Sequence, residues 1–263
     1  MPTFARTFSL RCALVAIGLT ALGAAQAQST QLTVTITNLA PANGLAFAPL
    51  RVGFGNGSFD AFNIGQVAGA PIVSVAEGGS GAAWFPAFAA ADPGALTGTV
   101  GGLLLPGASA QAQFTVNMST QGVFTFASMV VPSNDFFIGN DDPMEYKLFS
   151  ASGQLMMPSI TVKAREIWDA GSEVFDPAAA AFVGNNGLRS DQNSVVALNF
   201  AELAAFNGLT TGAGYTFNSS LTADSDVYRI DFALAPVPEP STYAMLLGGL
   251  ALVAARRLRA RQG

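Results

Sequence analysis

Two acidic loops hold the side chains with the clearest chemical potential in this 263-residue chain. The first loop contains Asp135, after an apolar run, and the second contains Asp169 and Glu173. Hard cations such as calcium bind six to eight oxygen atoms at roughly 2.3–2.6 Å, many of them from loop carboxylates. Gly171 lies between the last two acids and allows a tight turn that would bring them toward one centre. These three acids therefore form a candidate calcium site.

The same residue types also have an explanation that needs no metal. Aspartate and glycine are common in turns for backbone reasons, so these acids could instead be solvated turn residues. Asn140, Asp141 and Asp142 are reserve oxygen ligands, which we expect to be solvated or to cap turns. The choice between a metal site and ordinary turns depends on how the loops are positioned.

A catalytic function has little support in the sequence. The chain has no histidine, so the commonest general base and histidine-based zinc sites are missing. A glycosidase uses two carboxylates, which Asp169 and Glu173 could formally supply. A carbohydrate-active hydrolase is kept as an alternative, and we predict that the protein is not an enzyme.

The two loops also resemble a known family. Ser128–Gly139, which reads SMVVPSNDFFIG, and Trp168–Glu173, which reads WDAGSE, are together similar to the spondin domain of extracellular-matrix proteins such as F-spondin. The resemblance spans roughly Gln31–Leu234, but its sharp motifs cover only the loops. It implies a β-sandwich, similar to calcium-dependent membrane-binding domains, that holds calcium at one end. Carried over by position, the implied ligands are Asp135, Asp169 and Glu173.

The chain departs from the spondin pattern at three positions. Asn134 and Phe136 stand where the family has proline and tryptophan, which should matter little for ligation. Glu173 stands where the family has aspartate. Its longer side chain can still bind a cation.

Strand signals must position these loops. Alternating or apolar runs predict strands at Gln31–Asn38, Leu50–Phe54, Ala112–Met118, Val123–Val131, Glu145–Phe149, Ser159–Trp168 and Val227–Leu234. The turn at Ser119–Gly122 predicts that the two strands around it form a hairpin. Short strands separated by turn signals favour an all-β fold, an antiparallel β-sandwich of spondin type with short helices in its loops.

The region 58–102 is rich in glycine, alanine and proline, and we expect loops between short strands there, the clearest being Ile72–Val75. Trp84, Phe85 and Phe88 are expected to cover the core of the sandwich, with a ligand-binding surface as the alternative. A short helix is expected around Ala197–Phe206.

Both ends of the chain carry export signals. Residues 1–27 have a positive start, a short apolar core and the cleavage pattern Ala25-Gln26-Ala27, which are typical of a secretory signal peptide. The apolar run is shorter than the roughly 20 residues of a membrane-spanning helix. The single cysteine, Cys12, lies within this segment, so residues 28–236 would form a cysteine-free domain.

The C-terminal segment 237–263 contains Val237-Pro-Glu-Pro240, an apolar stretch expected to form a short transmembrane helix, and a final arginine cluster. This order resembles the PEP-CTERM sorting signal of Gram-negative bacteria. The resemblance implies recognition by an exosortase, transient insertion in the inner membrane, removal of the tail, and delivery to the cell surface or biofilm matrix. A plain C-terminal anchor is the alternative.

Charge excludes one class of partner. Six of the 12 basic residues lie in the two terminal segments, so a product ending near Glu239 keeps 6 basic and 17 acidic residues and carries about −11. Such a surface repels nucleic acid. We therefore predict a secreted, calcium-binding interaction or adhesion module of the envelope or biofilm matrix, whose partner is a matrix polysaccharide or surface protein. The alternative is calcium-dependent membrane binding through exposed Phe136, Phe137 and Ile138.

Overall fold

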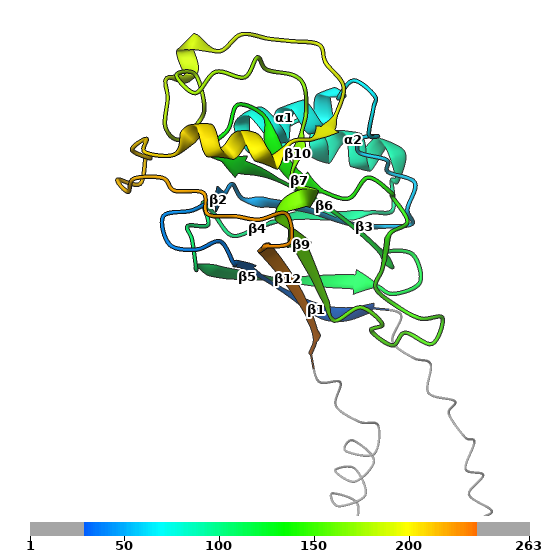
Figure 1. Ribbon diagram of the computed structural model, residues 1–263. Helices are drawn as coiled ribbons and strands as arrows, with labels where there is room; N and C mark the ends of the chain where they lie inside the picture. The colour runs from blue at the N-terminus through cyan, green and yellow to red at the C-terminus, as the bar shows by residue number, and fades with distance from the viewer. Residues whose placement is uncertain (1–28, 236–263) are drawn as a thin grey trace, which may run out of the picture. The chain divides into compact units, whose positions relative to one another are not determined.

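Two antiparallel sheets pack face to face in the part of the chain that the computed structural model describes, residues 29–235 (Figure 1). The described residues belong to one compact unit, Gln28–Val237. The predicted all-β antiparallel sandwich is therefore confirmed. The predicted signal peptide and the predicted helix of the tail lie outside the described residues.

The smaller sheet has the strand order β5-β1-β12-β9. Its strands are β1 (Ser29–Asn38), β5 (Ser109–Asn117), β9 (Ser159–Lys163) and β12 (Asp226–Leu234). Leu32, Val34 and Ile36 of β1 are fully buried, whereas the threonines between them are partly exposed. Alternate residues of a strand point to opposite faces, so this pattern places one face on the core and the other toward solvent, as the sequence predicts.

The larger sheet has the order β11-β10-β7-β6-β3-β4, and β2 and β8 also pair with β6. Its strands are β2 (Ala46–Phe47), β3 (Leu50–Gly55), β4 (Leu96–Val100), β6 (Val123–Val131), β7 (Phe136–Gly139), β8 (Tyr146–Lys147), β10 (Trp168–Asp169) and β11 (Ala197–Leu198). Every residue of β6 is buried. Phe124 and Phe126 pack in the core shared with the smaller sheet, and Ala127 packs in a second core under two helices.

These helices, α1 (Ala70–Gly78) and α2 (Trp84–Ala91), lie on the face of the larger sheet that is turned away from the smaller one (Figure 1). The strand predicted at Ile72–Val75 is wrong, because this segment is part of α1. Buried Ile72, Val75 and Ala76 follow the helical spacing of three and four residues, which outweighs the β-branched character of Ile72 and Val75. Gly79 ends the helix with a left-handed φ of 58°.

The predicted core cover is confirmed for Trp84 and Phe88 of α2, and Phe85 is partly buried against the same hydrophobic cluster. Trp84 and Phe88 are 0% and 2% exposed. Gly53 of β3 makes this packing possible, because a Cβ atom there would lie 2.0 Å from Phe88 Cε2. The absence of a side chain at this position lets α2 approach the sheet closely.

The predicted hairpin around Ser119–Gly122 is wrong, although both of its strands exist. β5 pairs with β1 in the smaller sheet, and β6 pairs with β3 and β7 in the larger sheet. The turn therefore carries the chain from one layer to the other. The helix expected around Ala197–Phe206 is partly confirmed, since a 3-10 helix, η3, occupies Phe200–Phe206 after the short strand β11. A further short 3-10 helix, η2, occupies Asn186–Leu188.

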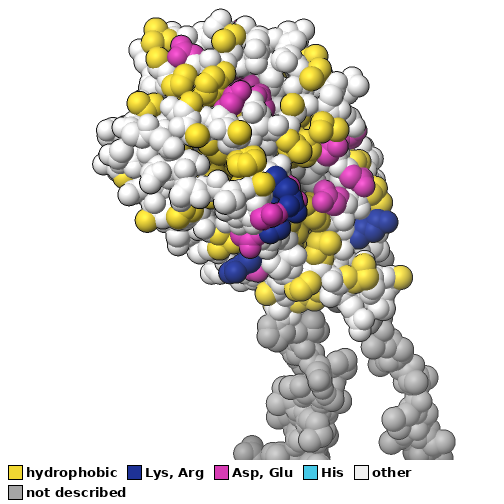
Figure 2. Space-filling view, viewed as in Figure 1, with side chains coloured by type: hydrophobic (Ala, Val, Ile, Leu, Met, Phe, Trp, Pro, Cys, Tyr) yellow, Lys and Arg dark blue, Asp and Glu magenta, His cyan; other side chains and the backbone are white. Residues whose placement is uncertain are grey.

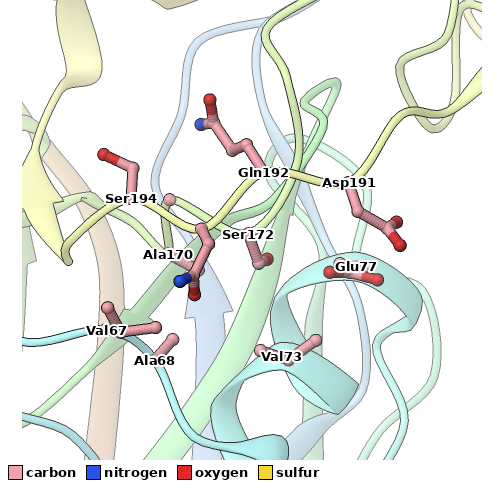
Figure 3. A pocket seen from close by; sticks show the side chains of 11 residues that line it. Val67, Ala68, Val73, Glu77, Ala170, Ser172, Asp191, Gln192 and Ser194 are labelled. Carbon is pink, nitrogen blue, oxygen red and sulfur yellow. The ribbon is translucent and has the colours of Figure 1, made fainter.

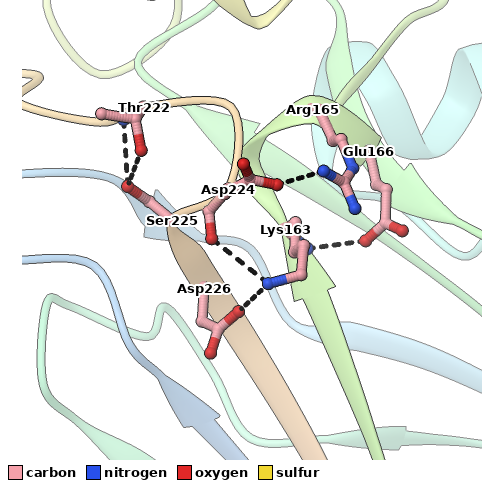
Figure 4. A network of polar contacts seen from close by, with 7 residues as sticks. All are labelled: Lys163, Arg165, Glu166, Thr222, Asp224, Ser225 and Asp226. Carbon is pink, nitrogen blue, oxygen red and sulfur yellow. Dashed lines mark hydrogen bonds and ion pairs between the residues drawn. The ribbon is translucent and has the colours of Figure 1, made fainter.

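The chain crosses between the sheets again from β9 to β10, through the 3-10 helix η1 (Ala164–Glu166). A polar network holds this crossing against the turn that precedes β12 (Figure 4). Lys163 Nζ lies 2.8 Å from Asp226 Oδ1, and Arg165 forms an ion pair with Asp224. Both pairs are exposed, so they fix the local geometry and contribute little free energy. The crossing places Asp169 on the larger sheet.

The visible surface in Figure 2 shows the few lysine and arginine side chains lying beside aspartate and glutamate side chains. Three of the ion pairs are exposed: Lys163–Asp226, Arg165–Asp224 and Arg229–Asp231. Within residues 29–235, no helix has the length and apolar character needed to cross a membrane.

Candidate functional site

The two acidic loops meet at neighbouring strands of the larger sheet. Asp135 directly precedes β7, and Asp169 is the last residue of β10. These strands are antiparallel, and Asp169 is paired with Phe136. The Trp168 indole Nε1 also donates a hydrogen bond to the Gly139 carbonyl at 3.0 Å. The structure thus brings the predicted loops together at one end of the sheet.

Asp135 organises the second loop through its carboxylate. Its Oδ2 accepts hydrogen bonds from Ser172 N at 2.7 Å, Ser172 Oγ at 3.2 Å and Glu173 N at 3.0 Å. The side chain is only 2% exposed. Burial, and secondarily the nearby charge of Asp169, raises the pKa of Asp135 to about 6, although the three hydrogen bonds oppose that rise.

Asp169 holds the turn that follows β10. Its Oδ1 accepts a hydrogen bond from Gly171 N at 2.8 Å, and its Oδ2 accepts one from Asn199 Nδ2 at 3.2 Å. Gly171 has a φ of +65°, and a Cβ atom there would lie 2.8 Å from the Val195 carbonyl oxygen. The expectation that Gly171 allows a tight turn is confirmed, and the neighbouring chain leaves no room for a side chain.

Glu173 is buried and incompletely paired. It is 2% exposed, its Oε1 lies 3.1 Å from Arg189 Nη1, and its Oε2 has no hydrogen-bond partner. Burial raises the pKa of Glu173 to about 7, Arg189 lowers it, and the charges of Glu77, Asp135 and Asp191 raise it further. A buried carboxylate oxygen without a partner is energetically costly, so Glu173 is a candidate for a functional role.

The fit of a hard cation to these residues is partial. Carboxylate oxygens are the donors that calcium prefers, and Glu173 Oε2 lacks the partner that a cation would supply. However, Glu173 is already paired with Arg189, and the described residues contain no group of three or more His, Cys, Asp or Glu side chains arranged to hold a metal ion. The donor chemistry fits calcium, but the three acids do not form a finished coordination cage.

The apolar residues that follow Asp135 were expected to be exposed. The structure instead buries Phe136, Phe137 and Ile138, which are 2%, 0% and 0% exposed, because β7 lies inside the larger sheet with both faces covered. The proposed insertion of these residues into a bilayer is therefore wrong.

The reserve ligands are engaged in local structure. Asn140 Oδ1 accepts from Phe126 N at 3.1 Å, Asp141 Oδ1 accepts from Ile64 N at 3.0 Å, and Asp142 Oδ1 accepts from Met144 N at 2.8 Å. Such side-chain acceptors satisfy backbone groups in turns. The expected turn capping is confirmed for Asp142, whereas Asn140 satisfies a backbone donor within β6 and Asp141 satisfies one in a segment distant in sequence.

An acidic pocket of about 280 Å³ adjoins the second loop (Figure 3). Glu77 of α1 and Asp191 line it together with Ser172 and nearby amide and hydroxyl side chains. Sequence reasoning did not identify Glu77, Asp191, Arg189 or Asn199 as parts of this region. These residues lie outside the two loops in sequence, and no local motif connects them to the loops.

Comparison with known proteins identifies one feature of the chain. Residues 236–261 match the PEP-CTERM protein-sorting motif, which confirms the sorting tail expected at 237–263. No curated protein matches the chain significantly. The motif implies processing by an exosortase. It marks the chain as an exported protein that is sorted toward the cell surface of Gram-negative bacteria.

Proposed function

We propose that the domain of residues 28–236 is an interaction module that acts at the cell surface or in the extracellular matrix. The observation that carries this proposal is the PEP-CTERM motif at 236–261, which directly follows a single compact sandwich. A protein delivered to the surface as one rigid domain is suited to binding a neighbouring polymer or protein. Its partner is a matrix polysaccharide or a surface protein.

Calcium would act as a structural ion at the acidic end of this module, held by Asp135, Asp169 and Glu173. It would add positive charge to a partly dry site in which Arg189 is paired with only one of the three carboxylates, that of Glu173. The raised pKa values of Asp135 and Glu173 and the unpartnered Glu173 Oε2 support this proposal. We include in this proposal that the two loops form a calcium site of the spondin type.

Binding is favoured over catalysis at this site. Glu173, one member of the glycosidase-type pair considered from the sequence, is 2% exposed and ion-paired with Arg189. A carboxylate in that position has poor access to substrate and water. We therefore infer that the acidic end is not a hydrolase active site.

Surface delivery can be tested in the native host. An epitope tag placed in the exposed turn at residues 151–152 would be detected with antibody on intact cells and on permeabilised cells. We expect the tag to be accessible on intact cells, and we expect this signal to be lost when residues 237–263 are deleted. A tag that is detected only after permeabilisation of wild-type cells would contradict surface delivery.

A second measurement tests the role of calcium in binding. Washing the same cells with a calcium chelator should release the protein into the medium, and a wash with a magnesium-containing buffer should not. The matched variant is Asp169→Asn, with Asp176→Asn as control, because Asp176 lies outside the proposed ligand set and its Oδ1 accepts from the exposed Ala178 N. Equal retention of the protein by cells in all washes would argue against calcium-dependent association.

A further inference from the structure

The acidic pocket has two chemically different walls. Glu77 and Asp191 lie close together on one side, and Val67, Ala68 and Val73 form an apolar wall on another (Figure 3). The remaining lining residues are small, hydroxyl-bearing or amide-bearing, and none is aromatic. The pocket thus offers negative charge beside an aliphatic surface.

A third carboxylate lies beneath these two. Glu173 forms an antiparallel bridge with Asp191, and Val174 N→Ser190 O and Gln192 N→Ser172 O, both at 2.8 Å, flank the pair. Directly opposed residues of an antiparallel ladder project to the same face and lie close together. The Glu173 side chain is therefore on the face from which Asp191 lines the pocket, and its Oε2 is buried without a partner.

One guanidinium, that of Arg189, only partly offsets the charge of these three carboxylates. Arg189 Nη1 lies 3.1 Å from Glu173 Oε1, and Arg189 Nη2 donates to the Glu77 carbonyl oxygen at 2.8 Å. Arg189 thus contacts the side chain of Glu173 and the backbone of Glu77, and neither contact involves the side-chain carboxylate of Glu77. The pocket keeps an excess of negative charge.

The end of α1 adds to this excess. Glu77 is in the last turn of the helix, where the helix dipole is negative, and this turn contains no basic residue. An acidic side chain at a helix C-terminus is unfavourable, whereas a cation there is favourable. A local arrangement that opposes folding in this way is typical of a functional site.

From this geometry we propose that the pocket binds a lysine side chain presented by a partner protein. The ammonium group is placed between the carboxylates of Glu77 and Asp191, and the aliphatic stem lies along Val67 and Val73. The inference rests on the proposed function as an interaction module, and it names the chemistry of the partner.

Two observations favour a protein partner over an amino sugar. The pocket has no aromatic platform on which a sugar ring could stack. Its edge instead carries Val67 and Val195, which are paired with each other across a β-bridge and are 51% and 45% exposed. Exposed apolar residues beside a charged anchor site are typical of protein interfaces. A metal ion is less suitable in this pocket, because within residues 29–235 only two carboxylates, those of Glu77 and Asp191, line it.

The test uses the domain of residues 28–237, which forms one compact unit with its own core. The probe is a fluorescein-labelled peptide, Gly-Gly-Val-Lys-Val-Gly-Gly, titrated by fluorescence anisotropy. A matched peptide carries Nε-acetyl-lysine, which keeps the stem and removes the charge. We expect saturable binding of the lysine peptide and, since a hydrogen bond to a charged group is lost, binding about tenfold weaker for the acetylated peptide.

Matched protein variants locate the contact. Glu77→Gln and Asp191→Asn should each weaken binding of the lysine peptide about tenfold without lowering the melting temperature. Glu145→Gln removes an exposed carboxylate outside the pocket and should bind as the wild type does. Absence of peptide binding, equal binding of the acetylated peptide, or wild-type binding by both pocket variants would overturn the proposal.

Competition separates the remaining alternatives. If glucosamine displaces the peptide at the concentration at which free lysine does, the pocket is an amino-sugar site and the lysine proposal fails. If calcium displaces the peptide, and this displacement requires the carboxylates of Glu77 and Asp191, the pocket is an ion site and the lysine proposal also fails. None of these results depends on surface delivery or on release by chelator, so a failure here is distinguishable from a failure of the proposed function.

Discussion

Replacement of Asp135 by alanine and by asparagine should separate two contributions of this residue to stability. Its Oδ2 accepts hydrogen bonds from the backbone N–H groups of Ser172 and Glu173, at 2.7 and 3.0 Å. Asparagine keeps an acceptor oxygen at this position and removes the charge, whereas alanine removes both. The comparison between the two variants therefore isolates the acceptor.

The expected magnitude follows from the two donors. A buried hydrogen-bonding group left without a partner costs about 1–3 kcal/mol, and the Ser172 N–H is only partly buried. We therefore expect Asp135→Ala to be about 2–4 kcal/mol less stable than Asp135→Asn. Because burial raises the pKa of Asp135 to about 6, the carboxylate is ionised at pH 8 at a cost in folding free energy. Asparagine avoids this cost, so the asparagine variant should be no less stable than the wild type.

Urea unfolding of residues 28–237 at pH 8, without calcium, measures this difference. The slope of the free energy of unfolding against urea should be equal for the two variants if the folded state is intact. Asp176→Ala and Asp176→Asn form the control pair, since Asp176 Oδ1 accepts a single hydrogen bond, from Ala178 N, at an exposed site. Equal stability of Asp135→Ala and Asp135→Asn would refute the claim that Asp135 organises the second loop.

Three further predictions concern the same region. Burial raises the pKa of Glu173 from 4.5 to about 7, so between these pH values the folded state binds a proton that the unfolded state has released. The free energy of unfolding, measured by chemical denaturation at each pH, should therefore fall by about 3 kcal/mol as the pH rises from 5 to 8. Glu173→Gln should remove most of this dependence, and an unchanged profile would contradict the assignment. Gly171→Ala should lower the melting temperature markedly, since φ is +65° and the new Cβ would lie 2.8 Å from the Val195 carbonyl oxygen; calorimetry showing no decrease would contradict the geometry. Arg189→Met should destabilise the domain by about 3 kcal/mol at pH 8, because it leaves the buried charge of Glu173 unpaired. This loss of folding free energy should be smaller at pH 5. A loss that does not vary with pH would count against the Arg189–Glu173 pair.

Strong alternation made most of the sandwich predictable. The runs around Leu32–Ile36 and Val227–Leu234 alternate between buried and more exposed positions, because each lies in a sheet with one solvated face. The pairing of strands was less predictable. The turn at Ser119–Gly122 has the composition of a hairpin, yet it joins different sheets. Local sequence determines where a turn occurs, but the choice of partner strand depends on tertiary packing.

The helices over the larger sheet were missed for a related reason. The β-branched residues from Ile72 to Val75 favoured a strand, but Pro71 in the first turn and Gly79 after the last were available as helix signals. Because the helices cover the larger sheet, β7 is enclosed on both faces, which also explains why Phe136–Ile138 are buried rather than exposed.

The acidic loops were predictable, and their surroundings were not. Asp135 and Asp169 come together because their strands are adjacent, as the two loop patterns predict. Arg189 and Asn199, which pair with Glu173 and Asp169, follow from long-range packing. The sequence identifies acids that can bind a cation, but it does not identify the basic and amide groups that compete for them.

Thermal unfolding of residues 28–237 with calcium, with magnesium and with chelator tests the central claim most directly. A ligand that binds only the folded state stabilises it, by about 2.7 kcal/mol at a hundredfold excess over Kd. We expect a rise in melting temperature that is specific for calcium, is absent in Asp169→Asn and is retained in Asp176→Asn. An identical melting temperature in all three conditions would contradict a calcium-stabilised acidic end and would leave the acids as turn residues of a surface-sorted sandwich.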